Sequence, residues 1–178
     1  MGRRVLLPVI FVLASIPILL VSRRSFRRPA SHGFFRFFAF ETDLLLLLLN
    51  AEHWFRAVLA PRQIVSWLLL LGSLVLAIHG FYLLRKLGDP KGGIDSTRTL
   101  VILGAYRHIR HPLYSSLLLF AWGACLKSPS LPAVALAMGA SAFVTATALA
   151  EERENLIKFG DAYSAYMRSN KRFVPFIY

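Results

Sequence analysis

Residues 64–84 read IVSWLLLLGSLVLAIHGFYLL, an apolar stretch whose only polar interruptions are Ser66, Ser73 and His79. A helix of about 20 residues is about 30 Å long, which matches the hydrocarbon core of a bilayer. The next residues, 88–93, read GDPKGG, and such a glycine and proline cluster ends a helix. The sequence therefore predicts a membrane-spanning helix at the centre of the chain.

Four more apolar stretches surround this one, at residues 5–21, 34–59, 112–126 and 131–150. The last two are joined by Lys-Ser-Pro-Ser at 127–130, a tight connection that predicts an antiparallel helical hairpin. Beyond residue 150 the helix becomes charged, and Gly160 with Asp161 starts a short helix that runs towards Arg168. We therefore expect an all-α integral membrane protein with about five transmembrane helices and a short cytosolic C-terminal helix.

Two of these stretches allow a second interpretation. Residues 5–21 could be a signal peptide, but Val-Ser-Arg-Arg at 21–24 is a poor cleavage site and favours a retained anchor. Residues 34–59 could lie in the membrane interface, since only 44–49 form an unbroken apolar core. Their polar residues could equally line a tunnel for a substrate; they are Glu41, Asp43, Asn50, Glu52 and His53.

The composition supports one membrane domain over residues 1–178, with three spans in 1–87 and a functional region in 88–178. Of the 178 residues, 56% are hydrophobic, which is too many for a soluble domain of this size. The single cysteine, Cys125, excludes a disulfide framework and a cysteine-based metal site. No histidine and acidic residues recur at ligand spacing, so no metal is expected.

The net charge of +12 is explained by orientation in a membrane, because the basic residues cluster at the ends of apolar stretches. We therefore do not expect nucleic-acid binding. Five spans place sixteen of the 21 Lys and Arg residues on one side, whereas four spans would divide them thirteen to eight. The positive-inside rule thus favours five spans, with the N-terminus outside and the C-terminus in the cytosol.

This topology brings two distant charged segments to the same cytosolic level. Residues 106–114 read YRHIRHPLY, and residues 151–154 read EERE. Pro112 suits the first turn of a helix, where its missing N–H costs nothing, so His111 lies at the helix entrance. Because the hairpin returns to the level at which it began, we expect the two segments to face each other.

These segments, with their neighbours, resemble the isoprenylcysteine carboxyl methyltransferase family of membrane methyltransferases, which is related to the phospholipid N-methyltransferases. The resemblance extends over residues 98–177 and rests on these pieces: Thr99-Leu100-Val101, Gly104-Ala105-Tyr106, Arg110-His111-Pro112-Leu113-Tyr114, Glu151-Glu152, Phe159-Gly160-Asp161 with Tyr163 and Tyr166, and Phe173-Val174-Pro175-Phe176. It implies that S-adenosylmethionine binds at the cytosolic ends of the last two spans without a Rossmann domain. The absence of a Gly-x-Gly-x-Gly fingerprint agrees with this.

The same resemblance implies individual roles for residues. The expected cofactor-binding residues are Thr99, Leu100, Val101, Tyr106, His111, Pro112, Leu113, Tyr114 and Glu151. A carboxylate such as Glu151 can hold ribose hydroxyl groups or an amino group, and tyrosine rings can pack on adenine or on a cation. The resemblance also implies that the protein is a methyltransferase. Its expected substrate is a lipidic or prenylated compound that enters from the bilayer.

One position departs from the family pattern. Relatives commonly carry an arginine one helical turn before the first glutamate, where it can meet an acceptor carboxylate, whereas this chain has Thr147. Arg110 and Arg153 are the expected substitutes near the reacting groups. The acceptor therefore stays open between the carboxylate of a prenylated cysteine, a phospholipid, and another lipid that is methylated on nitrogen or oxygen.

Two other functions are compatible with the same pattern. Membrane sterol reductases, which are much longer, have a similar C-terminal region that binds a reduced nicotinamide cofactor. A non-catalytic membrane scaffold would keep the architecture without the chemistry, and Thr147 is compatible with that. Binding of NADPH would indicate a reductase-like protein. Loss of all cofactor binding in a folded sample would indicate a non-catalytic scaffold.

Overall fold

The computed structural model describes residues 2–91 and 97–174, with side chains from residue 6 onward. Gly92 and Gly93 of the expected helix break, and Pro175 and Phe176 of the family resemblance, lie outside the described residues. The described part is all-α, and its α-helices are α1 (Gly2–Ser22), α2 (His32–Leu49), α3 (Pro61–Leu87), α4 (Pro112–Lys127), α5 (Leu131–Phe159) and α6 (Asp161–Ser169). Short 3₁₀ turns lie between them at η1 (Ser25–Arg27), η2 (Ala51–His53) and η4 (Gly104–Arg107).

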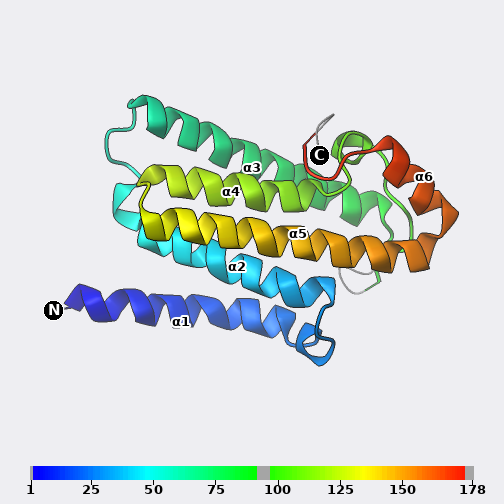
Figure 1. The fold of residues 1–178 in the computed structure, drawn as a ribbon, viewed down its shortest axis with the longest axis horizontal. Helices are drawn as coiled ribbons and strands as arrows, with labels where there is room; N and C mark the ends of the chain where they lie inside the picture. The colour runs from blue at the N-terminus through cyan, green and yellow to red at the C-terminus, as the bar shows by residue number, and fades with distance from the viewer. Residues whose placement is uncertain (1, 92–96, 175–178) are drawn as a thin grey trace.

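The five long helices lie side by side and alternate in direction, as Figure 1 shows. Helix α2 packs on α1, α4 and α5, while α3 packs chiefly on α4. At one end of the bundle lie the loop that precedes α4, the charged end of α5, and α6 (Figure 1). The expected hairpin of α4 and α5 is confirmed, and so is the short C-terminal helix.

Small side chains allow close approach of the central helices. On α5, the buried face repeats at Ala133, Ala137 and Ala140, and it meets Ala121 and Ala124 of α4. Small residues at such contacts let helix backbones come together without large side chains between them, as is common within membranes. The outward faces of α1 and α3 carry exposed leucine, isoleucine and valine side chains. This exposure is what a lipid-facing surface requires.

Within the described residues, α3 and α5 are long and apolar enough to cross a membrane by length and composition, and Leu6–Ser22 forms a shorter apolar helix. The expected stretch 64–84 lies within α3, which ends at Leu87, so the break at Gly88 is confirmed. Helix α5 continues through its charged residues to Phe159, nine residues beyond the apolar stretch 131–150.

The second expected helix, residues 34–59, is too long in the sequence-based prediction. Helix α2 ends at Leu49, where the Asn50 backbone N–H still bonds to the Leu46 carbonyl. The buried Asn50 side chain donates a hydrogen bond to the Ala124 carbonyl, 2.9 Å away. This tertiary contact satisfies the Asn50 amide at the helix end, and turns with a short 3₁₀ helix replace the helix from residue 50 to residue 60.

Candidate functional site

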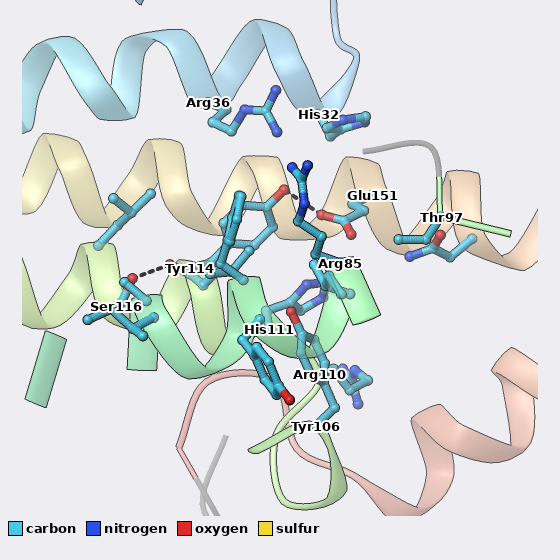
Figure 2. Close-up of a pocket in the computed structure, with 18 of the residues that line it drawn as sticks. His32, Arg36, Arg85, Thr97, Tyr106, Arg110, His111, Tyr114, Ser116 and Glu151 are labelled. Carbon is cyan, nitrogen blue, oxygen red and sulfur yellow. Dashed lines mark hydrogen bonds between the residues drawn. The ribbon is translucent and has the colours of Figure 1, made fainter. Parts of the chain in front are cut away.

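A large cavity lies between α2, α3, α4 and α5, near the end of the bundle that carries α6. Its volume is about 870 Å³, within the range of small-molecule sites. Its side chains come from α2, α3, the loop before α4, α4 itself and α5, as Figure 2 shows for the labelled residues. The deeper wall is apolar, with Phe40, Ile78 and Phe81 among its members. The outer wall is polar, and it includes Tyr106, Tyr114 and Glu151.

The start of α4 and the charged end of α5 meet at this polar wall. The Tyr114 hydroxyl group donates a hydrogen bond to the Glu151 carboxylate (Figure 2). The Tyr114 ring also stacks on the His111 ring, with 5.3 Å between the ring centroids. The sequence-based expectation that segments 106–114 and 151–154 face each other is therefore confirmed.

Tyr106 is a buried residue of the polar wall, with 7% of its surface exposed. Burial raises the pKa of its phenol above the ordinary value, and the nearby Glu151 and Tyr166 raise this pKa further. The phenol therefore stays protonated at neutral pH. It presents a hydrogen-bond donor and an aromatic face to a ligand.

Next to Glu151, Glu152 points away from the cavity into a buried ionic cluster. Its carboxylate accepts hydrogen bonds from Arg110 Nε at 3.0 Å and Arg172 Nε at 3.1 Å, and its Oε1 lies 3.2 Å from His111 Nε2. Burial alone would raise the pKa of Glu152, but the hydrogen bonds with His111 and the two arginines outweigh burial and hold the pKa well below its ordinary range. Glu152 is thus a charged anchor for three segments.

The C-terminal residues fix the loop that precedes α4. The backbone N–H groups of Arg110 and His111 donate to the carbonyls of Lys171 and Arg172, at 2.8 and 3.1 Å. The Ser115 hydroxyl group donates to the Phe173 carbonyl at 2.9 Å. These bonds hold the tail beside the start of α4. His111 is therefore fixed by its backbone bond to the tail and by its side-chain contact with Glu152.

Helix α6 holds the other half of the same loop. The Tyr166 hydroxyl group donates to the Tyr106 carbonyl at 2.6 Å, and the Asn170 amide donates to the Arg107 carbonyl at 2.6 Å. On the opposite side, the Ala105 N–H donates to His79 Nε2 of α3 at 3.3 Å. Gly104 has a φ of +58°, and a Cβ atom there would lie 2.6 Å from the same His79 nitrogen. The turn therefore requires glycine.

A second, smaller cavity of about 40 Å³ lies next to the first one. Thr99, Leu100 and Val101 line it from the loop, together with Tyr163 and Tyr166 of α6. The two cavities share these wall residues: Leu84, Thr97, Tyr106, Arg110, Glu151 and Asn155. The two cavities are therefore adjacent parts of one site.

The structure places most of the residues expected from the sequence around these two cavities. The large cavity is lined by Tyr106, Arg110, His111, Leu113, Tyr114 and Glu151. Pro112 is buried against Gly80 and is not among the lining residues of either cavity. Arg153 is exposed and lines neither of them. The guanidinium of Arg110 is held by Glu152 and by the carbonyls of Met167 and Asn170.

Several lining residues were not expected from the sequence. Arg36 of α2 and Arg85 of α3 were interpreted only as charges that orient the chain, yet both line the large cavity (Figure 2). His32 also lines it, and its Nδ1 lies 2.6 Å from the Glu154 carboxylate. A signal existed on α5, since Glu154, Asn155 and Lys158 follow Glu151 at helical spacing and share its face. No such spacing connects α2 or α3 to the site.

The departure at position 147 also has a clear structural form. The Thr147 side chain is buried, with 1% of the residue exposed, and its hydroxyl group donates to the Phe143 carbonyl at 2.7 Å within α5. The threonine is therefore satisfied inside its own helix. It provides no charge to the cavity.

Comparisons with known proteins agree with this site. No curated protein and no solved structure matches the chain. The sequence model described as phospholipid methyltransferase matches residues 61–160, which include α3, α4, the loop between them and all of α5. The matched residues contain most of the lining of both cavities. The chain therefore belongs to the phospholipid methyltransferase family, whose members are membrane enzymes that methylate lipids with S-adenosylmethionine.

Proposed function

We propose that this protein transfers a methyl group to the headgroup of a membrane lipid that reaches the large cavity from the bilayer, between α2 and α3. The observation that carries the proposal is the continuity of one cavity from the polar wall at Tyr106 and Glu151 to the apolar wall at Phe40 and Ile78. Ile78 and Phe81 are themselves 62% and 44% exposed on the bundle surface. An amphiphilic molecule could thus keep its chains near lipid while its headgroup enters the site.

The residues present fit S-adenosylmethionine by their chemistry. Glu151 offers a carboxylate for ribose hydroxyl groups or an amino group, and Tyr106 and Tyr114 offer aromatic faces for a cation. The smaller cavity, with Thr99, Leu100 and Val101, offers a partly apolar wall for adenine. When bound, the cofactor supplies a methyl group on a positively charged sulfur atom, so that the protein needs no nucleophile of its own.

The contribution of the protein is then to hold donor and acceptor in contact and to exclude water. Tyr114 orients the Glu151 carboxylate through its hydrogen bond. The anchored loop and tail keep His111 and Tyr106 in place. Rigid positioning of this kind is the main requirement for an in-line displacement.

We favour the amine of a phospholipid headgroup as the acceptor, with the carboxyl group of a prenylated cysteine as the second candidate. The resemblance of Arg110 to Tyr114 supports the second candidate, because the related enzymes methylate that carboxyl group. The three positions at which the sequence predicts a charge for that carboxyl group do not favour it: Thr147 carries no charge, Arg110 is engaged by Glu152, and Arg153 is exposed. An amine acceptor would have to lose a proton before it reacts.

We also propose that all five long helices cross the membrane, with the cofactor site in the cytosol. Their alternating directions in Figure 1 support this topology. The end of the bundle near α6 carries the basic residues at 23–36, 85–110 and 153–172, as the charge count requires. The water-soluble cofactor would then enter from the cytosol, and the lipid from the membrane.

Titration of the purified protein with S-adenosylhomocysteine tests the proposed function. We expect saturable binding that Glu151→Ala and His111→Ala each weaken about tenfold or more, since each removes a polar contact. Matched controls are Glu52→Ala at the opposite end of the bundle and His108→Ala on the exposed side of the loop. Absence of binding, or affinities unchanged by both site variants, would refute the proposal. Binding of NADPH in place of S-adenosylhomocysteine would indicate a reductase-like protein.

A further inference from the structure

We propose that Arg36 of α2, together with Arg85 of α3, forms the site for an oxyanion on the acceptor lipid and so replaces the arginine that isoprenylcysteine carboxyl methyltransferases commonly carry where this chain has Thr147. This inference rests on the proposed function and assigns a specificity-determining role within it. Helix α2 lies outside the residues that match the family, 61–160. Arg36 would therefore supply its charge from a helix outside the matched residues, whereas Arg85 of α3 lies within them.

The register between α2 and α5 places Arg36 at the correct depth. The Phe38 ring stacks on the Phe143 ring, with 5.3 Å between centroids, and His32 pairs with Glu154. The two helices run in opposite directions, so residues between 32 and 38 lie opposite residues between 154 and 143. Arg36 thus lies at the level of the α5 turn that contains Thr147.

Both arginines occupy the same position relative to the apolar wall. On α2, Phe40 lies one turn deeper than Arg36, and both line the cavity. On α3, Phe81 and Ala77 lie one and two turns deeper than Arg85, and they line it as well. A charged level above an apolar level on two facing helices matches an amphiphile with an anionic group next to its chains. The guanidinium fork suits phosphate and carboxylate oxygens.

Three further lining cations have printed contacts to other residues of the protein, and Arg36 also has contacts of its own, so the oxyanion site rests on where Arg36 and Arg85 lie and not on a lack of partners. Arg110 binds Glu152, Lys158 donates to the Thr97 carbonyl, and Lys86 donates to the Tyr82 hydroxyl group at 2.9 Å. Each of these contacts holds the cation against another residue of the protein. Arg85 has no hydrogen bond or ion pair to another residue in the ranges 2–91 and 97–174 that the structure describes. Its charge is therefore available to a ligand.

Methyl-transfer kinetics with two acceptors test this site. The first acceptor is phosphatidylethanolamine in phosphatidylcholine vesicles, and the second is a farnesylated cysteine with a free carboxyl group. For the phosphate lipid, we expect Arg36→Gln and Arg85→Gln each to raise the KM about tenfold or more, because each removes a charge-assisted hydrogen bond. For the carboxyl acceptor the anion itself reacts, so the same variants should lower kcat.

The affinity for S-adenosylhomocysteine separates this site from the cofactor site and reports folding in the same samples. We expect it to stay within about twofold in both variants. Arg36→Lys should raise the KM less than Arg36→Gln does, since lysine preserves the charge but not the planar guanidinium fork. The controls are Arg28→Gln at the same end of the bundle and Arg62→Gln at the far end of α3; both side chains are exposed and line neither cavity.

Two results would overturn the oxyanion site. One is wild-type kinetics in both variants with both acceptors. The other is a parallel loss of affinity for S-adenosylhomocysteine, which would assign the arginines to the cofactor. If the wild-type protein bound S-adenosylhomocysteine but transferred methyl groups to neither acceptor, the proposed acceptor classes would fail first, and the oxyanion site would fail with them.

Discussion

The Tyr114 hydroxyl group donates a hydrogen bond to the Glu151 carboxylate across 37 residues of sequence, and this bond connects the first turn of α4 to the charged end of α5. Both side chains line the large cavity. The bond therefore orients a carboxylate that is placed to meet a ligand.

Removal of this hydroxyl group tests its importance. We expect Tyr114→Phe to weaken S-adenosylhomocysteine binding about tenfold, because Glu151 loses its orienting donor while the aromatic ring remains. Isothermal titration measures the change. Thr145→Ala is a suitable control, since its hydroxyl group bonds to the Ser141 carbonyl within α5. Equal affinities for Tyr114→Phe and the wild type would show that Glu151 needs no such orientation.

Glu152 should matter for stability more than for ligand contact. Its side chain is 5% exposed and pairs with Arg110 and Arg172. Glu152→Gln would leave two arginines without a counter-charge in a buried place, so we expect a loss of about 3 kcal/mol in the free energy of unfolding. The comparison is Glu154→Gln, whose side chain is 46% exposed beside His32 and should cost less than about 1 kcal/mol. Thermal unfolding in detergent would distinguish them, and equal melting temperatures would contradict this account.

The same carboxylate predicts a dependence of stability on pH. Because the folded protein holds the pKa of Glu152 below its ordinary value near 4.5, the ionised form stabilises the fold. This contribution is complete above that value and disappears as the pH falls through the lower folded pKa. We therefore expect the difference in melting temperature between the wild type and Glu152→Gln to be constant near neutral pH and to shrink below about pH 4.5. A difference that grows on acidification would exclude the assignment.

Cysteine labelling tests the five-span topology. With Cys125 replaced by alanine, single cysteines at Arg27 and Arg56 should be labelled from opposite sides of the membrane if α2 crosses it. Both side chains are exposed, so a membrane-impermeant thiol reagent can reach them in oriented vesicles. A cysteine at Arg168 should behave like the one at Arg27. Labelling of residues 27 and 56 from the same side would favour four spans, with α2 in the interface.

Much of the fold follows from local sequence. The apolar length of residues 64–84 and the glycine and proline residues after it determine α3 and its end. Pro112 at the start of α4 and the short connection before α5 determine the hairpin, and the hairpin alone is enough to bring Tyr114 to Glu151. These features depend on helix length and on residues close in sequence, which a linear pattern contains.

Other features depend on contacts between helices far apart in the chain. The end of α2 at Leu49 is fixed by the bond from Asn50 to Ala124, and the buried charge of Glu152 is shared with Arg172 of the tail. The position of Arg36 in the cavity wall depends on the axial register between α2 and α5. Helical periodicity specifies which residues share a face, but it does not specify which depth of one helix meets which depth of another. The sequence by itself determined a membrane methyltransferase pattern at one end of a helical hairpin, whereas only packing between helices decided which arginines line its cavity.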